Sequence, residues 1–267
     1  MKSHSPIGVF DSGLGGLTVV KAMRSVLPNE SIIYFGDTAR VPYGNKSPEL
    51  IKEYSLQITD FLLENNTKII VVACNTATAL ALDTLQEKLD IPIIGVVKPG
   101  VDSALKLTKN NRIGVIGTIS TIKSDVYSTE LKNNNPSINV ISLSCPLFVP
   151  LAEEGWLNEP ATKLIAEKYL EPIKTSNVDT LILGCTHYPL LTEVIQEVVS
   201  FKIQLVDSAK AIAIATANLL TENKLLNDSR NTSDLSLFVS DFPARFETVA
   251  SRFLGEKISN VEKIQLG

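Results

Sequence analysis

Short apolar runs alternate along the chain with longer stretches in which apolar residues recur at helical spacing. The short runs predict strands, and the stretches between them predict amphipathic helices. In the first hundred residues we expect strands at 7–10, 32–35, 68–73 and 91–97, and helices at 17–27, 47–62 and 76–88. Ser47 and Pro48 support the second helix, because serine caps helix N-termini and proline fits the first turn.

Two of the expected strands are apolar without interruption, at 69–73 and 93–97. Strands that are apolar on both faces are typical of a parallel sheet covered by helices on both sides. We therefore expect an α/β fold with mostly parallel sheets flanked by helices. Because ligands bind such sheets at the carboxyl ends of the strands, the residues that directly follow the strands are the candidates for chemistry.

The order of the apolar runs recurs in the second part of the chain. The runs at 7–10, 71–74 and 93–97 have counterparts at 113–116, 181–185 and 203–206. This recurrence predicts two pseudo-symmetric α/β domains with the active site in the cleft between them. The C-terminal segment continues beyond the second repeat. We expect it to contain a helix at 209–220, a polar loop at 227–234, a strand at 235–239 and a helix at 242–254. We expect it to pack on the first domain, so that residues 1–98 and 208–267 form that domain and residues 99–207 form the second, inserted domain.

The composition narrows the class of protein. The chain has 267 residues, of which 44% are hydrophobic and 20% charged, and a net charge of −4. No apolar run is long enough to span a bilayer and no secretory signal is visible, so we expect a cytoplasmic protein without a membrane partner. The acidic balance and the lack of a basic block argue against a nucleic-acid partner. Three cysteines are a poor disulfide framework, which also favours a reducing compartment.

Two of the cysteines occupy equivalent positions in the two halves. Cys74 and Cys185 each follow a predicted strand and precede a helix start, where the helix dipole favours a thiolate. If a pseudo-twofold axis relates the halves, the two thiols approach one substrate from opposite sides. Inversion of a stereocentre by proton transfer needs a base on one face and an acid on the other, which such a pair supplies. Cys145 has no counterpart and is interpreted as a core residue.

Other residues after strands could hold an amino-acid substrate. Asp11 and Ser12 are placed to hold an ammonium and a carboxylate, and the turns at Asn75-Thr76 and Thr186-His187 offer backbone N–H donors for a carboxylate. Tyr43 and Gly44 could contact a side-chain carboxylate. An alternative for Asp37 is a salt bridge with Arg40, and Glu153 and Glu154 would ordinarily be solvated charges at a helix start.

Three other functions fit the residues less well. The spacing of Cys185 and His187 is not a zinc pattern, and no C-x₂-C pair exists, so we expect no metal site. A hydrolase with a cysteine nucleophile would have only His187 as base candidate and would leave Cys74 unexplained. The DSGLGG stretch at 11–16 lacks both the P-loop ending and the dinucleotide spacing.

The motifs FDSGLGG, FGDTARVPYG, ACNTAT, CPLFVPLAEEG and LGCTHYPLL, in this order, resemble those of the glutamate racemases in the aspartate/glutamate racemase superfamily. The resemblance spans nearly the whole chain. It implies interconversion of L- and D-glutamate without pyridoxal phosphate, metal or any other cofactor, to supply D-glutamate for peptidoglycan in a bacterial cytoplasm. A homodimer is the candidate assembly.

The resemblance also implies residue roles. Cys74 matches the base for D-glutamate, assisted by Asp11, and Cys185 matches the base for L-glutamate, assisted by His187. Glu153 and Asp37 belong to the same assisting set. The substrate-binding set implied by the resemblance is Asp11, Ser12, Tyr43, Gly44, Asn75, Thr76, Thr186 and His187.

Two alternatives stay open beside this resemblance. Aspartate racemase is the near one, although the VPYG and DSGLGG loops favour glutamate. The other is an interaction protein, because some glutamate racemases inhibit DNA gyrase; the acidic balance gives this no support.

Overall fold

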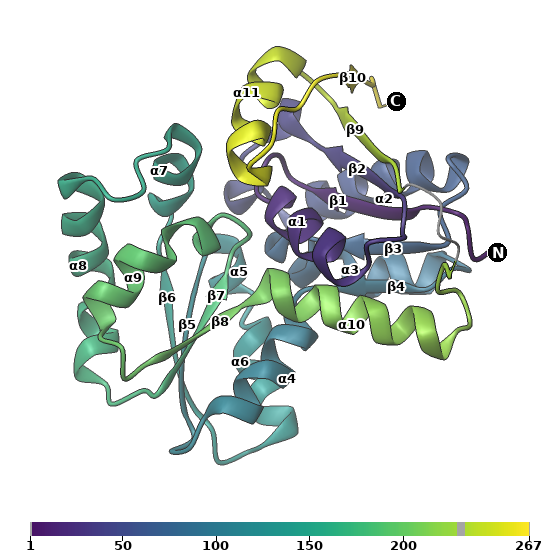
Figure 1. The fold of residues 1–267 in the computed structure, drawn as a ribbon. Helices are drawn as coiled ribbons and strands as arrows, with labels where there is room; N and C mark the ends of the chain where they lie inside the picture. Colours follow the sequence, from purple (N-terminus) through teal and green to yellow (C-terminus); the bar gives the residue numbers. More distant parts are fainter. Residues whose placement is uncertain (1, 229–232, 267) are drawn as a thin grey trace.

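The computed structural model describes residues 2–228 and 233–266. In this part of the chain two sheets are each flanked by helices (Figure 1). Every strand pairing between the described residues is parallel. The expected α/β class with parallel sheets between helices is therefore confirmed.

The first sheet has the strand order β10-β9-β2-β1-β3-β4, and we call it, with its helices, the first lobe. Its strands are β1 (Ile7–Asp11), β2 (Ile32–Gly36), β3 (Ile69–Val72), β4 (Ile93–Gly95), β9 (Leu235–Val239) and β10 (Val261–Lys263). Its helices are α1 (Leu17–Val26), α2 (Pro48–Glu64), α3 (Asn75–Lys88), α10 (Ser208–Glu222) and α11 (Pro243–Leu254).

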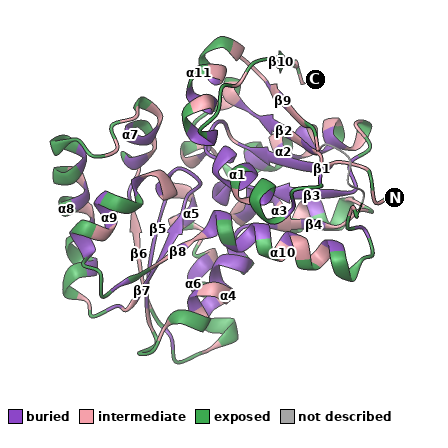
Figure 2. Cartoon of the chain, in the orientation of Figure 1, coloured by how far each residue is buried: buried purple, intermediate pink, exposed green. Residues whose placement is uncertain are grey.

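Alternation along β3 explains why both faces of this sheet are covered. Ile69 and Val71 pack into a cluster with residues of α1, α10 and α11, whereas Ile70 and Val72 pack into a separate cluster with residues of α2 and α3. Successive side chains of a strand point to opposite faces, so an uninterrupted apolar strand requires helices on both. Figure 2 shows the resulting pattern, with buried strands and helices whose outer faces are exposed.

The second sheet has the order β6-β5-β7-β8, and we call it, with its helices, the second lobe. Its strands are β5 (Arg112–Gly117), β6 (Asn139–Ser144), β7 (Thr180–Gly184) and β8 (Gln204–Asp207). Its helical elements are α4 (Val97–Leu107), α5 (Ile119–Lys123), α6 (Val126–Asn134), α7 (Phe148–Glu154), α8 (Pro160–Thr175), η3 (Tyr188–Leu191) and α9 (Thr192–Val199). Leu181 and Leu183 pack with residues of α7, α8 and α9, and Ile182 packs with residues of α4 and α6.

Some expected boundaries were wrong. The strand expected at 91–97 is only the short β4, because α4 begins at Val97 with Pro99 in its first turn, where proline is tolerated. The long loop after β2 contains two 3₁₀ turns, η1 (Thr38–Arg40) and η2 (Tyr43–Asn45). Part of the polar loop expected at 227–234 lies outside the described residues.

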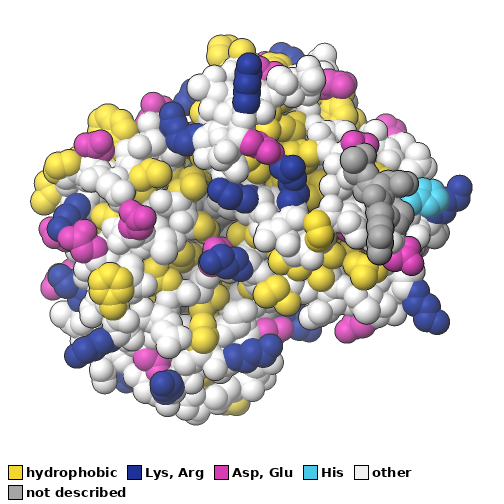
Figure 3. Space-filling model, in the orientation of Figure 1, with side chains coloured by type: hydrophobic (Ala, Val, Ile, Leu, Met, Phe, Trp, Pro, Cys, Tyr) yellow, Lys and Arg dark blue, Asp and Glu magenta, His cyan; other side chains and the backbone are white. Residues whose placement is uncertain are grey.

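The described part of the chain contains no helix with the length and apolar character needed to cross a membrane. On the face drawn in Figure 3, the lysines and arginines are interspersed with acidic side chains.

Candidate active site

A cavity of about 380 Å³ is lined by residues that lie just after strands of both sheets. Ser12 follows β1, Cys74 follows β3 and Thr118 follows β5, while the Cys185–His187 turn follows β7. The cavity is also lined by Val41–Asn45 from the loop after β2 and by Val149, Pro150 and Glu153 from α7. Its place agrees with the general rule that parallel sheets bind ligands at the carboxyl ends of their strands.

Most of the expected site residues meet in this cavity. Those that line it are Ser12, Tyr43, Gly44, Cys74, Asn75, Thr76, Glu153, Cys185, Thr186 and His187. Asp11 and Asp37 do not line it and are fully buried. Cys145 is also fully buried, in the core of the second lobe.

Cys74 forms the N-cap of α3. The chain turns out of β3 at this residue, and its Sγ accepts a hydrogen bond from the backbone N–H of Ala77 at 3.4 Å. Burial and, after it, the negative charge of Asp11 raise the pKa of the Cys74 thiol to about 12, against the lowering effect of hydrogen bonds from Ala77 and Ser12. The helix N-terminus does favour the thiolate through the N–H of Ala77, as expected, but the cost of desolvating the charge is larger, so the net effect on this pKa is upward.

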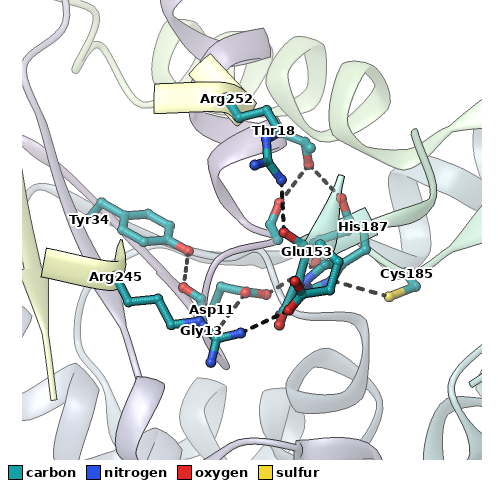
Figure 4. A network of polar contacts seen from close by, with 12 residues as sticks. Asp11, Gly13, Thr18, Tyr34, Glu153, Cys185, His187, Arg245 and Arg252 are labelled. Atoms are coloured by element: carbon teal, nitrogen blue, oxygen red, sulfur yellow. Dashed lines mark hydrogen bonds and ion pairs between the residues drawn. The ribbon is translucent and has the colours of Figure 1, made fainter. Parts of the chain in front are cut away.

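Cys185 lies at the start of a hydrogen-bonded series with His187 and Glu153 (Figure 4). Its Sγ is 3.8 Å from Nδ1 of His187, and Nε2 of His187 is 3.1 Å from a carboxylate oxygen of Glu153. Burial alone would lower the pKa of His187, but the hydrogen bonds and charges of Cys185 and Glu153 outweigh it and raise the pKa to about 10. The imidazole thus connects a thiol to a carboxylate.

Glu153 is on the last turn of α7, so the expectation of a helix start was wrong. Burial would raise the pKa of its carboxyl, but the hydrogen bond and charge of His187 outweigh this effect and lower it. The side chain therefore carries a negative charge directed at the imidazole.

Asp11 lies beneath the cavity, between the lobes. One oxygen accepts a hydrogen bond from the N–H of Gly13 at 3.0 Å and the other is 3.4 Å from the hydroxyl of Thr186. Burial raises the pKa of Asp11, against the opposing charge of His187. Asp11 therefore contacts the turn that carries Cys185, whereas Cys74 feels only its charge.

Asp37 stabilises the loop that forms one wall of the cavity. It makes a salt bridge with Arg40 at 2.7 Å and accepts hydrogen bonds from the hydroxyls of Tyr43 at 2.5 Å and Ser240 at 2.8 Å. The alternative considered from the sequence, a salt bridge to Arg40, is thus present. Asp37 does not face the interior of the cavity. It holds Tyr43, which lines the cavity, and so fixes the position of this loop.

Asn75 and Thr76 contact residues that sequence reasoning missed. The hydroxyl of Tyr127 donates a hydrogen bond to Oδ1 of Asn75 at 2.6 Å, while the buried Nδ2 of Asn75 has no hydrogen-bond partner among the described residues. The hydroxyls of Thr76 and Thr118 are 3.0 Å apart. Thr118 could have been found as the counterpart of Ser12, because each follows the first strand of its half. Tyr127 is in α6 and gave no such signal.

A hydrogen bond between the lobes holds the Cys185 turn in place. The hydroxyl of Thr18, on α1, lies 2.8 Å from the carbonyl oxygen of Gly15 and 2.9 Å from that of Thr186. Among the described residues, no three His, Cys, Asp or Glu side chains gather in a way that could hold a metal ion, and all three cysteines are free thiols. From the residues that the structure describes, the cavity offers two thiols, one imidazole, the carboxylate of Glu153 and the unpaired amide nitrogen of Asn75.

Comparisons with known proteins agree with this geometry. Residues 9–216 match the family described as Asp/Glu/Hydantoin racemase. A glutamate racemase from Geobacter metallireducens is 50% identical over 260 residues, which cover 97% of this chain and 96% of the relative.

Solved structures show the same similarity in three dimensions. A glutamate racemase isoform from Bacillus anthracis has a TM-score of 0.96 at 39% identity, and a glutamate racemase from Francisella tularensis in complex with D-glutamate has 0.93 at 42%. Each match covers 99% of this chain and 98% of the other. By its sequence, its fold and the cavity between its two sheets, the chain belongs to the glutamate racemases, which are amino-acid racemases of the Asp/Glu/Hydantoin racemase family.

Proposed function

We propose that the protein interconverts L- and D-glutamate by a two-base mechanism in which Cys74 and Cys185 act on opposite faces of the α-carbon, without a cofactor. The observation that carries this proposal is that both thiols follow equivalent strands of the two sheets and line one cavity. One thiolate takes the α-proton, while the other thiol delivers its proton to the opposite face. The substrate is unchanged in composition, and the two sulfurs exchange protonation states.

The surroundings of the two sulfurs give them different starting roles. Because burial holds the proton on Cys74, this thiol is ready to donate. Cys185 lies beside His187, whose raised pKa keeps a positive charge between this sulfur and the carboxylate of Glu153. This arrangement fits the assignment of Cys185 as the base for L-glutamate and Cys74 as the base for D-glutamate.

Hydrogen-bond donors around the cavity suit an anionic amino acid. The unpaired Nδ2 of Asn75 and the hydroxyls of Thr76 and Thr186 can donate to carboxylate oxygens. Ser12, Tyr43 and Gly44, which also line the cavity, complete the proposed substrate-binding set. The Francisella tularensis relative was solved with D-glutamate, which supports a substrate of this size and charge.

We also propose that residues 1–98 with 208–267 and residues 99–207 are two domains that enclose the substrate. In support, β9 pairs with β2 and residues of α10 pack in the same cluster as β1, so the tail shares the core of the first lobe. The strands of the second sheet all lie between Arg112 and Asp207.

The two-base mechanism is tested with Cys74→Ala and Cys185→Ala. Each variant is expected to lose racemisation of both glutamate enantiomers while retaining the wild-type circular dichroism spectrum. Near-normal turnover by either variant would exclude the mechanism. Aspartate, assayed in parallel, should be a poor substrate. The enzyme should also keep its activity after exhaustive dialysis, and adding pyridoxal phosphate or a metal ion should not increase it.

The proposed cellular role is the supply of D-glutamate for peptidoglycan in the cytoplasm. Expression of the chain should allow a bacterial strain that requires D-glutamate to grow without it. The Cys74→Ala variant is the matched control and should not support growth. Equal growth with both chains would contradict the role.

A further inference from the structure

Helix α11 of the first lobe approaches the Cys185 side of the cavity from outside. The ring of Phe253, near the end of α11, lies 5.9 Å from the ring of His187, with the two planes almost perpendicular. The next residue back, Arg252, donates a hydrogen bond from Nη1 to the backbone carbonyl of Glu153 at 3.0 Å. One turn of a helix from the opposite lobe therefore contacts both His187 and Glu153. Figure 4 shows Arg252 beside Glu153.

The end of α7 is shaped to receive Arg252. The helix ends at Gly155, which has a left-handed φ of 77°. A Cβ at Gly155 would lie 2.5 Å from Nη1 of Arg252, so the glycine leaves room for the guanidinium. The last carbonyls of a helix lack intrahelical partners and attract positive charge. Arg252 thus caps the turn of α7 that carries the Glu153 side chain.

We propose that Arg252 is a positioning residue for the Cys185 half of the reaction. By capping α7 it keeps the Glu153 carboxylate within hydrogen-bond distance of His187, and the ring of Phe253 restricts the tilt of the imidazole. His187 in turn keeps Nδ1 directed at the sulfur of Cys185. Arg252 itself does not line the cavity.

The Cys74 side has a different kind of support. Its sulfur accepts from the N–H of Ala77 and interacts with Ser12, and neither contact depends on α11. Loss of Arg252 should therefore weaken proton transfer at Cys185 and leave transfer at Cys74 unchanged. The inference rests on the two-base proposal, since it assigns the two transfers to two different sulfurs.

The test compares Arg252→Ala with Arg252→Lys, using Arg24→Ala as a control. Arg24 forms an exposed ion pair with Glu256, away from the cavity. Arg252→Ala should lower kcat about 10- to 100-fold through misplacement of the relay, with KM for glutamate within twofold of wild type. Arg252→Lys should recover much of the loss, and Arg24→Ala should behave as wild type. Because Arg252 is exposed, the melting temperature should change by less than about 3 °C.

Kinetic isotope effects can distinguish a specific effect of Arg252 on proton transfer at Cys185 from a general loss of order in the active site. With glutamate deuterated at the α-carbon, removal of the proton by Cys185 should become more rate-limiting in Arg252→Ala. The isotope effect on kcat/KM should therefore rise for L-glutamate and fall for D-glutamate. A lower kcat with both isotope effects unchanged, or a kcat within twofold of wild type, would overturn the inference. If Cys185→Ala retains turnover, the two-base proposal fails instead.

Discussion

Gly15 of the first lobe lies directly against His187 of the second: a Cβ on Gly15 would be 2.5 Å from Nδ1 of the imidazole. The same atom would also collide with the hydroxyl of Thr186. The two lobes therefore meet behind the cavity at a contact that only glycine permits, and this contact holds the turn that carries Cys185.

Gly15→Ala is expected to displace this turn. We predict a loss of kcat of about 10- to 100-fold, because displacements near 1 Å can have this effect on a reacting geometry. Stability should fall by about 1–3 kcal/mol, the usual cost of overpacking. Gly100→Ala is the control, since a Cβ there would make only ordinary contacts with Tyr127 at 3.6 Å or more, and it should leave kcat unchanged. A wild-type kcat for Gly15→Ala would show that the contact is not needed.

Tyr127 should affect substrate binding through Asn75. In Tyr127→Phe, Oδ1 of Asn75 loses its donor, and the amide is free to turn its oxygen toward the substrate carboxylate. We expect KM for glutamate to rise about tenfold, the effect of one hydrogen bond, with a smaller change in kcat. Steady-state kinetics measure both. In an Asn75→Ala background the same change should have no further effect on KM, and additive effects would argue against this coupling.

The raised pKa of His187 should be visible in the pH dependence of the protein's stability. Its pKa is about 10 in the folded protein, above the ordinary value of 6.5, so the folded state holds this proton where the unfolded state has lost it. The stabilisation is complete below pH 6.5 and is lost as the pH rises toward 10, by at most about 1.4 kcal/mol per pH unit. Thermal melts of the wild type should show this decline. The decline should be smaller in His187→Gln, and identical slopes in the two proteins would contradict the raised pKa.

A buried ion pair at the other end of the first sheet should matter for stability alone. Lys68 is fully buried, 2.5 Å from Glu30, and also donates to the carbonyl oxygen of Leu225 at 2.8 Å. Lys68→Met removes the cation that faces the buried side chain of Glu30, which should cost about 3–5 kcal/mol in urea denaturation. The exposed pair of Lys163 and Glu197 is the control, and Lys163→Met should cost less than about 1 kcal/mol. A similar loss of unfolding free energy in both variants would contradict the prediction that the buried ion pair matters more than the exposed one.

The sequence alone predicted the two cysteines of the site and the fold class, because both depend on residues that are close together in the chain. Cys74 and Cys185 were found because each follows an uninterrupted apolar strand, and parallel strands bring their carboxyl ends together. The α/β class followed from the same strands. The edge strand β6 was harder to predict, because none of its residues is buried and its apolar pattern is therefore weak.

Contacts between distant segments could not be predicted. Tyr127 reaches Asn75 from another lobe, and Arg252 reaches Glu153 across 99 positions of the chain. The pKa of Cys74 was expected to be low because a helix start is visible in sequence, whereas the burial that raises it depends on the assembled core. Asp37 was grouped with the assisting residues, but the structure directs it toward Arg40 and the loop wall.

The pairing of β9 with β2 has a consequence for synthesis on the ribosome. All strands of the second sheet lie between Arg112 and Asp207, so that sheet can assemble while the C-terminal segment is still being made. The first sheet must wait for Leu235–Val239 before β2 gains its second neighbour. The half of the molecule translated first is thus the last to be finished, and until then β2 is an exposed edge open to wrong partners.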